Sequence, residues 1–289
     1  MQIMKLLLVI NPISGDQDKE PFVKKIKDHV NSQDELDIFR TNGENDLEQL
    51  REYFRKKYDR VLVIGGDGTV KLVAEAMDDS PVSIGIIPAG SANGLASDLG
   101  LPESPEDAIT VALGSETRKI DGVYLNGELG LHISDLGLNA ELIKEYENGF
   151  FRGKLGYALN SIPTLFQSEG PYDFTIQTKN RTRKIRGIML AFANSKKFGT
   201  GAVVNPDGKI DDGIFEILVF KKLDFIEIIK TLQHTEQLSR DFVEIIPVKE
   251  VRVTTTKPVD FQVDGEYCQA VSEVRARIAP QKLEIAVGK

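Results

Sequence analysis

The pentapeptide Gly65-Gly66-Asp67-Gly68-Thr69 has the residue types of a phosphate-binding turn. It directly follows the apolar run 61–64 and directly precedes an amphipathic segment, so it predicts a strand that ends in a turn and continues as a helix. Backbone N–H groups at the N-terminus of a helix bind anions such as phosphate. A tight turn that binds nothing would use the same glycines, so this turn alone favours phosphate binding only modestly.

Three further polar turns follow strand-like runs in the first third of the chain. The runs are 5–10, 36–40 and 82–87, and each is followed by small polar residues and then by a plausible helix. Alternating strands and helices imply right-handed βαβ units and a parallel sheet, so all four turns are expected at one edge, where such sheets bind ligands. We therefore predict a nucleotide site built from backbone N–H groups and from neutral hydroxyl and amide side chains. Its predicted residues are Asn11, Ser14, Thr41, Gly65, Gly66, Asp67, Gly68, Thr69, Ser91 and Asn93.

The two common nucleotide signatures are absent from the sequence. There is no Gly-x-x-x-x-Gly-Lys-Ser/Thr motif, and the dinucleotide fingerprint fails because Lys71 stands at its third glycine position. P-loop NTPases and Rossmann dehydrogenases are therefore disfavoured. Three motifs match another family in order and spacing: Asn11-Pro12-x-Ser14-Gly15, the pentapeptide 65–69, and Pro88-Ala89-Gly90-Ser91-x-Asn93. They resemble the catalytic domain of diacylglycerol kinases, sphingosine kinases and related bacterial lipid kinases.

The resemblance extends over nearly the whole chain through weaker landmarks in its second half. These are Asn194, Gly199, Gly201, Pro206, Asp211-Asp212-Gly213 and Asp264-Gly265-Glu266. NAD kinases share the glycine pentapeptide, but as a family they lack the Asn-Pro-x-Ser-Gly turn and the Asp-Gly-Glu landmark. The resemblance implies an ATP-dependent kinase that phosphorylates a hydroxyl of diacylglycerol or a similar lipid. A kinase of a soluble acceptor, such as NAD kinase, and a non-catalytic nucleotide or lipid sensor on the same scaffold stay open as alternatives.

The composition is that of a globular protein and disfavours several classes. At 289 residues the chain is long enough for two domains. Its net charge of -8 disfavours a general nucleic-acid binder, so no nucleic-acid partner is expected. The single cysteine, Cys268, cannot form an internal disulfide, which fits a reducing compartment, and we expect it to be buried. No run has transmembrane length, so we expect a cytoplasmic enzyme that visits the inner face of the membrane as a peripheral protein. The oligomeric state is left open.

The regular alternation of strands and helices ends near residue 120. From there strand-like runs predominate, at 129–134, 172–178, 186–193, 214–220, 248–255, 259–263 and 271–278, with helices expected at 139–147, 154–167 and 223–238. We predict an α/β plus β-rich fold, with a parallel-sheet α/β nucleotide domain at 1–121 and a β-rich lipid-substrate domain at 122–289. The resemblance, which is to the NAD-kinase and diacylglycerol-kinase type of fold, implies that the second domain is a β-sandwich. In this family the last strands often return to the first domain.

Two acidic residues are candidates for the chemistry of phosphoryl transfer, which needs positioned phosphates, a metal ion and a group that accepts the hydroxyl proton. Asp67 could hold Mg²⁺ through a water molecule or orient the acceptor, or it could serve as a helix N-cap. Glu266 follows a predicted tight turn, and from the residues alone a solvated glutamate would be preferred. The family resemblance implies a catalytic function for both, with Glu266 as the general base.

The segment that contains Asp212 has the residues of a polar turn between strands. In bacterial members of the family a structural Mg²⁺ is held at this loop by backbone carbonyls and a carboxylate. On that pattern the carboxylate comes from Asp212 and the carbonyls from Lys209 and Ile214. Oxygen ligands of this kind suit a hard cation that keeps several of its waters. The resemblance thus implies Mg²⁺ as cofactor and ATP as phosphoryl donor.

The sequence departs from the family pattern after the glycine pentapeptide, where Lys71 and Leu72 replace the usual Asn-Glu. Lys71 could add a phosphate contact or face solvent. Basic residues at 179–186 and an aromatic pair at 150–151 could touch a membrane, with a solvated hairpin and a core aromatic pair as equal alternatives. The expected partners are therefore ATP, a lipid substrate and, transiently, the membrane surface.

Overall fold

The computed structural model describes most of the chain. The described residues are 3–16, 18–78, 80–91, 93–138, 140, 170–197, 203–222, 224, 227 and 238–288. Contacts between residues divide the chain into two compact units, the first comprising Met1–Ile120 with Gln281–Lys289 and the second Asp121–Pro280. Each unit has its own hydrophobic core.

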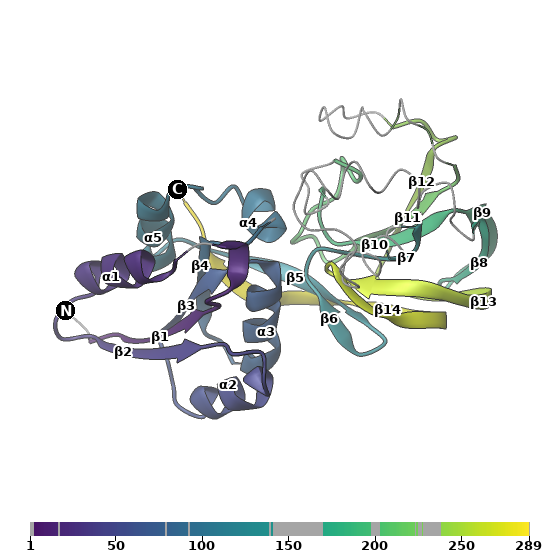
Figure 1. The fold of residues 1–289 in the computed structure, drawn as a ribbon. Coiled ribbons are helices and arrows are strands. Elements are labelled where there is room, and N and C mark those ends of the chain that lie inside the picture. Colours follow the sequence, from purple (N-terminus) through teal and green to yellow (C-terminus); the bar gives the residue numbers. More distant parts are fainter. Residues whose placement is uncertain are drawn as a thin grey trace. The chain divides into compact units, whose positions relative to one another are not determined.

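The first unit is built on a parallel sheet. Its strands are β1 (Lys5–Ile10), β2 (Glu35–Arg40), β3 (Arg60–Gly65) and β4 (Ser83–Pro88), in the order β4-β3-β1-β2 (Figure 1). Three of these strands, β1, β3 and β4, are mostly apolar. All of these neighbours run parallel, which confirms the prediction made from the alternation of strands and helices. The end of β14 (Glu266–Ala286) adds a further parallel neighbour to β4 through the pair Ile285 and Ile84.

Helices cover both faces of this sheet. They are α1 (Glu20–His29), α2 (Asp46–Phe54), α3 (Asp67–Met77), α4 (Gly94–Asp98) and α5 (Pro105–Leu113). Helices α1 and α5 pack on one face, and α2 and α3 lie on the other (Figure 1). Because α1 is amphipathic, it buries Phe22, Val23 and Ile26 against Leu8 and Ile10 of β1. Strands covered on both sides can be almost continuously apolar, as β1 and β3 are after their first residues, Lys5 and Arg60.

The second unit consists mainly of antiparallel strands. They are β5 (Thr117–Leu125), which begins in the first unit, β6 (Glu128–Gly130), β7 (Ile133–Gly137), β8 (Tyr172–Gln177), β9 (Thr182–Gly187), β10 (Met189–Ala193), β11 (Phe215–Phe220), β12 (Val243–Val248), β13 (Glu250–Val263) and most of β14. The order β12-β11-β10-β7-β13-β14 is antiparallel, and β8 and β9 extend the sheet from β13. Phe174, Phe192 and Phe215 fill the core of this unit.

Two predicted strands of the second unit are each divided in the structure. The run 129–134 forms β6 and β7 with a break at Leu131 and His132, because their N–H groups donate to the carboxylate of Asp264 instead of to a neighbouring strand. The run 186–193 is divided between β9 and β10 at Ile188, whose N–H donates to the carbonyl of Phe220. The first division follows from a contact with a residue far along the chain, whereas the bond at Ile188 joins β11, the neighbour of β10.

Strand β12 was not predicted, and the prediction for Cys268 was wrong. Pro247 interrupts the apolar pattern of β12, and it is tolerated because β12 forms the end of the strand order. Cys268 is exposed because it lies in the outward-facing first residues of β14. Among the described residues, no helix combines the length and the apolar character that spanning a bilayer requires.

Several predictions concern residues outside the described part of the chain. These are the predicted helices at 139–147, 154–167 and 223–238, of which only isolated positions are described, the aromatic pair at 150–151, and the landmarks Gly199 and Gly201.

Candidate functional site

The carboxyl ends of β1 to β4 bring the four polar turns to one edge of the parallel sheet. Ile10 at the end of β1 is level with Arg40 of β2 and Ile64 of β3, and Gly65 is level with Pro88 of β4. The turns therefore begin side by side, at the edge where parallel α/β sheets bind ligands.

Three of these turns pack against one another at glycines. A Cβ atom on Gly90 would lie 2.5 Å from the Cα of Gly66, and one on Gly15 would lie 2.5 Å from the carbonyl oxygen of Ala89. Gly15 also has a φ of 64°, a conformation that side chains disfavour. The contacting atoms belong to the backbone, so they cannot turn away as a side chain could. The turns after β1, β3 and β4 thus need these glycines in order to touch one another, whether or not a ligand is bound.

The turn after β2 is closed by its own residues. The N–H of Thr41 donates to the carbonyl of Ile10 at 2.9 Å, which continues the pairing of β2 with β1. The N–H groups of Asn42 and Gly43 donate to the carboxylate of Asp46 at 3.0 and 2.9 Å. Thr41 therefore adjoins the first turn, whereas the N–H groups that follow it are engaged within the second.

Asp67 joins the glycine-rich turn to helix α4. Its carboxylate accepts hydrogen bonds from the N–H groups of Gly94 and Leu95 at 2.7 and 3.0 Å. The first N–H groups of a helix have no partner within it, and a negative charge there also interacts favourably with the helix dipole. Asp67 is thus a helix cap, but for α4, because the N-cap of its own helix is Gly66. Each of its oxygens has a second lone pair for a further donor.

Two asparagines of the predicted site shape the turns. The Oδ1 of Asn93 accepts from the N–H of Gly90 at 2.8 Å, and its Nδ2 donates to the carbonyl of the same residue at 3.0 Å. The Oδ1 of Asn11 accepts from the N–H of Ile13 at 3.2 Å. Both side chains therefore stabilise the backbone of their own turns.

The remaining residues of the predicted nucleotide site differ in exposure. Gly68 and Ser91 are exposed and Ser14 is half-buried. Thr69 is buried, and its side chain fills the space that a Cβ on Gly65 would need. A ligand that approaches this edge would therefore meet Ser14, Gly68 and Ser91 before Thr69.

Lys19 is a buried cation that the sequence analysis missed. It directly precedes α1, and only 3% of its surface is exposed. Its ammonium donates to the carbonyl oxygen of Ser14 and, at 3.2 Å, to that of Ala89. A positive charge therefore ties the first turn to the fourth. One signal was available in the sequence, since a lysine at a helix N-terminus is unfavourable to the helix dipole and needs another reason to be there.

Lys71, the departure from the family pattern, is also buried, with 6% of its surface exposed. Helix α3 packs against both β3 and α2, so its second turn has little access to solvent. The alternative in which Lys71 simply faces solvent is therefore wrong.

In the second unit, Asp264 and Gly265 form a two-residue turn between β13 and β14. Their φ angles are 51° and 90°, and they connect the paired residues Val263 and Glu266. Two consecutive positive φ angles are typical of the type I′ turn that suits a β-hairpin. The tight turn predicted from the sequence is thus confirmed, and Glu266 is exposed at the first position of β14.

The carboxylate of Asp264 anchors this turn to a distant segment. It accepts from the N–H groups of Leu131 and His132 at 2.6 and 3.0 Å. The N–H of Gly265 donates to the Oε1 of Gln262 at 2.7 Å. Both residues of the turn are therefore held by side-chain hydrogen bonds, which fixes the backbone directly before the predicted general base.

The predicted metal loop, 209–214, is tied to the buried Asp121. The N–H of Asp121 donates to the carbonyl of Ile210, and its carboxylate accepts from the N–H of Gly213, both at 2.7 Å. Within the loop, the Oδ1 of Asp212 accepts from the N–H of Ile214 at 3.2 Å. The loop thus has a defined backbone that presents Asp212 to solvent.

Oxygen atoms and negative charge gather beside this loop. Burial raises the pKa of Glu216, and the charges of Asp212 and Asp207 add to the effect. The Nδ2 of Asn205 donates to Glu216 at 2.6 Å, which opposes the rise in its pKa. The side-chain oxygens of Asn194 and Asn205 are buried and accept no hydrogen bond from any described residue.

These groups fit a hard divalent cation, which favours oxygen ligands and uncompensated negative charge. The predicted ligands, the carbonyls of Lys209 and Ile214 and the carboxylate of Asp212, belong to one loop. No group of three or more His, Cys, Asp or Glu side chains placed to hold a metal ion occurs within the described part of the chain. The predicted set contains only one such side chain and relies on carbonyls for the rest.

Two protein-family models match the chain. "Diacylglycerol kinase catalytic domain" matches residues 5–125, and "YegS C-terminal NAD kinase beta sandwich-like domain" matches residues 135–287. The parallel-sheet unit, its glycine turns and the β-rich unit are those of a lipid kinase, and the chain is therefore a transferase. It belongs to the diacylglycerol kinase catalytic domain family and carries the YegS type of C-terminal β-sandwich domain.

Individual relatives agree with this family. The chain is 29% identical over 253 residues to the "Probable lipid kinase YegS-like" of Chromohalobacter salexigens, which covers 84% of this chain and 81% of that protein. It is 24% identical over 227 residues to the "Diacylglycerol kinase" of Bacillus subtilis, with 75% and 74% of the two chains covered. A crystal structure of a diacylglycerol kinase from Bacillus anthracis has the same fold, with a TM-score of 0.75, 17% identity and coverage of 100% of this chain and 98% of that one.

Lys19→Met should loosen the first and fourth turns. The substitution removes the ammonium from two carbonyl oxygens, and loss of a partner for a buried polar group costs about 1–3 kcal/mol. We expect a lower free energy of unfolding in urea and faster amide hydrogen exchange at 11–15 and 89–93. Lys24→Met, at an exposed position of α1, is the matched control and should change neither. Unchanged exchange in both turns of the Lys19 variant would contradict the proposed tie.

Proposed function

We propose that this lipid kinase transfers the γ-phosphoryl group of ATP to a hydroxyl of diacylglycerol or a similar lipid. The observation that carries the proposal is the packing of three turns at one edge of the parallel sheet, through contacts that require glycine at Gly15 and Gly90 and leave little room for a side chain at Gly66. Relatives named diacylglycerol kinase favour this acceptor over other lipids. The names of the relatives also favour a lipid over a soluble acceptor such as NAD.

The nucleotide phosphates are assigned to this edge. Helix α3 follows the turn after β3. The N–H of Thr69 donates to the carbonyl of Gly66 at 3.0 Å, so the N–H groups of Asp67 and Gly68 are the ones assigned to bind an anion. Ser14 and Ser91 add hydroxyl groups, and the ammonium of Lys19 adds positive charge beside them. The other members of the site shape the turns or let the backbone come close to the phosphates. They are Asn11, Thr41, Gly65, Gly66, Gly68, Thr69 and Asn93.

Asp67 is assigned a positioning role with an electrostatic component. Its carboxylate holds the N-terminus of α4 against the glycine-rich turn, which sets the position of the turn that contains Ser91. The remaining lone pairs of Asp67 can accept from water bound to the metal ion that accompanies the nucleotide. Its loss should therefore affect nucleotide binding as well as turnover.

Glu266 is assigned as the general base. A base must come within hydrogen-bonding distance of the hydroxyl whose proton it accepts, which requires a fixed backbone. The turn directly before Glu266 is held by the carboxylate of Asp264 and the side chain of Gln262, and Glu266 itself is exposed. This combination of a fixed backbone and an accessible carboxylate supports the assignment.

A structural Mg²⁺ is assigned to the loop 209–214. The carbonyls of Lys209 and Ile214 and the carboxylate of Asp212 would hold it. When bound, the ion would supply positive charge that offsets the acidic groups beside the loop. Asp121 would position the loop from its other side through the N–H of Gly213.

The lipid is assigned to the β-rich half of the chain, residues 122–289, and the nucleotide to residues 1–121. Because the acceptor is a lipid, the protein must contact the membrane transiently. The hairpin of β8 and β9 carries several cations: Lys179, Arg181, Arg183, Lys184 and Arg186. Arg183 forms an ion pair with Glu244, so the hairpin alone offers less free charge than its sequence suggests.

Phosphoryl transfer can be tested directly. Purified protein with radiolabelled ATP, Mg²⁺ and diacylglycerol in mixed micelles should yield labelled phosphorylated lipid, whereas NAD in place of the lipid should receive no label. Thin-layer chromatography separates the products. If no lipid of a total extract becomes labelled while NAD does, the acceptor is soluble and the proposal is wrong.

Glu266→Gln should lower kcat by about 10²–10⁴-fold and leave ATP affinity nearly unchanged, because the amide keeps the shape of the side chain but cannot accept the proton. Asp67→Asn should weaken both nucleotide binding and turnover. Glu128→Gln, an exposed glutamate on β6, is the control and should behave as the parent. A Glu266→Gln enzyme with the parent kcat would overturn the assignment of the base, and loss of ATP affinity would move Glu266 to the nucleotide site.

Asp212→Ala should lower activity, and excess Mg²⁺ should restore it at most in part, because the structural site has lost a ligand. In the absence of nucleotide, Mg²⁺ should raise the melting temperature of the parent and not that of the variant. Asp211→Ala removes the neighbouring acid and should keep the response to Mg²⁺. An equal shift in melting temperature for parent and Asp212→Ala would remove Asp212 from the metal site.

A further inference from the structure

An open groove of about 1130 Å³ lies on the second unit, beside strands β8, β13 and β14 and the turn after β5. Its lining contains one lysine and three arginines, Lys179, Arg252, Arg275 and Arg277, and one acid, Glu250. The chain as a whole has a net charge of -8, so this excess of cations is a local feature. We call it the cationic groove.

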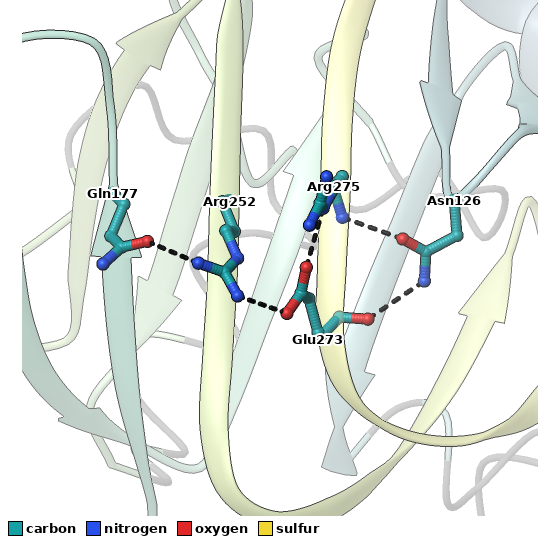
Figure 2. A network of polar contacts seen from close by, with 5 residues as sticks. All are labelled: Asn126, Gln177, Arg252, Glu273 and Arg275. Atoms are coloured by element: carbon teal, nitrogen blue, oxygen red, sulfur yellow. Dashed lines mark hydrogen bonds and ion pairs between the residues drawn. The ribbon is translucent and has the colours of Figure 1, made fainter.

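Two of the arginines are held by a single carboxylate (Figure 2). Arg252 and Arg275 are directly opposite each other on β13 and β14, an arrangement that is destabilising for like charges. Glu273 lies between them and accepts from the Nη2 of Arg252 and the Nε of Arg275, both at 2.7 Å. The hydrogen bond from Arg252 and, to a smaller extent, that from Arg275 lower the pKa of Glu273 to about 2, so Glu273 remains ionised. One negative charge thus serves two guanidinium groups.

Side-chain amides hold both ends of this network (Figure 2). The Oδ1 of Asn126 accepts from the N–H of Arg275 at 2.9 Å, and its Nδ2 donates to the carbonyl of Glu273 at 3.0 Å. On the other side, the Oε1 of Gln177 accepts from Arg252 at 3.4 Å. The row of side chains across three strands is therefore ordered before any ligand binds, which reduces the entropy lost on binding.

The other two cations of the groove are not neutralised by ion pairs with described residues. Arg277 is opposite Glu250 on β13, yet its guanidinium lies over the ring of Tyr124, 4.7 Å from the ring centroid. A guanidinium stacked on an aromatic ring keeps its N–H edge available, and that edge matches the geometry of a phosphate. Lys179 is exposed in the turn between β8 and β9 and forms no ion pair with the described part of the chain.

We propose that the cationic groove docks the protein on the phosphate groups of anionic phospholipids at a membrane surface. The groove is broad and open and takes its cations from separate segments, so it suits a surface that presents many phosphates at once. A site for a single small anion would instead be enclosed, with the groups that bind the anion buried. The inference rests on the proposed function only in that a lipid kinase must reach a bilayer, and its test measures binding without catalysis.

The test is flotation with vesicles, using the variant Lys179→Gln/Arg277→Gln. Neither side chain belongs to the Glu273 network, so the sheet should keep its structure and its melting temperature. The parent should bind vesicles of phosphatidylcholine with phosphatidylglycerol and not vesicles of phosphatidylcholine alone. At about 1 kcal/mol for each basic residue near anionic lipid, the double variant should bind roughly 30-fold more weakly. Binding of the parent should also weaken as salt is raised.

The matched control is Lys24→Gln/Arg51→Gln, which removes one exposed lysine and one exposed arginine from α1 and α2 of the first unit. It should bind vesicles as the parent does. An equal loss of binding in the two double variants would mean that only net charge matters, and would overturn the proposal. So would unchanged binding of the groove variant, or binding of soluble glycerol phosphate with the same affinity as vesicles.

Activity separates this inference from the proposed function. With a short-chain diacylglycerol dissolved below its micellar concentration, the groove variant should phosphorylate lipid at the parent rate, and it should fall behind only when the same lipid is supplied in anionic vesicles. A parent that binds vesicles through the groove but transfers no phosphate to any lipid would leave the groove assignment standing and refute the kinase reaction. A parent that phosphorylates soluble lipid but never binds vesicles would support the kinase reaction and refute the groove assignment.

Discussion

The hydrogen bonds from α4 to the carboxylate of Asp67 are the interaction on which the order of the edge that carries the four polar turns depends. They connect two turns whose residues are 27 positions apart, Asp67 and Gly94. A helix as short as α4, Gly94–Asp98, is not stable alone, because too few of its N–H groups have partners. Asp67 supplies those partners, and α4 in turn fixes the end of the turn that contains Ser91. The position of the exposed Ser91 is therefore set from a neighbouring turn.

The second unit repeats this device on different secondary structure. Asp264, beside Gly265, accepts from two successive N–H groups, those of Leu131 and His132. In both units an aspartate next to glycine reaches a distant backbone through a short side chain, and hydrogen bonds to an ionised group are roughly twice as strong as neutral ones. The glycine permits the turn, and the aspartate holds it in place. In both units a short acidic side chain thus fixes a turn, at Asp67 in the first unit and directly before Glu266 in the second.

Local chemistry decides which features the sequence could predict. Strands β1, β3 and β4 contain apolar runs that end in turn residues, and β2 is recognisable from the same kind of turn after it, so their positions and parallel direction followed from pattern alone. Strand β12 contains Pro247, which a local reading takes as a break, and only its place at the end of the strand order makes the proline acceptable. The turn of Asp264 and Gly265 was predictable because its residues determine its backbone.

Contacts between distant residues could not be predicted in this way. The burial of Lys19 depends on Ala89, which is 70 positions away, and neither residue signals the other. The same holds for the capping of α4 by Asp67, where the sequence suggested a cap but not the helix that receives it. Spacing identifies which residues share an edge of the sheet, whereas the pairing of particular groups depends on how the turns pack.

Because the end of β14 returns to the first unit, the first unit cannot be completed until the second has been synthesised. Leu283 and Ile285 are buried in a unit whose other residues end at Ile120, and Ile285 pairs with β4. During synthesis, one edge of β4 therefore stays unpaired until the whole of Asp121–Pro280 has been made. This takes on the order of 10 s at about 5–20 residues per second. Open strand edges recruit other chains. A nascent chain of this kinase is thus most prone to aggregate when its parallel-sheet unit is complete except for the end of β14, and this exposure ends when the β-rich unit and the end of β14 have been made.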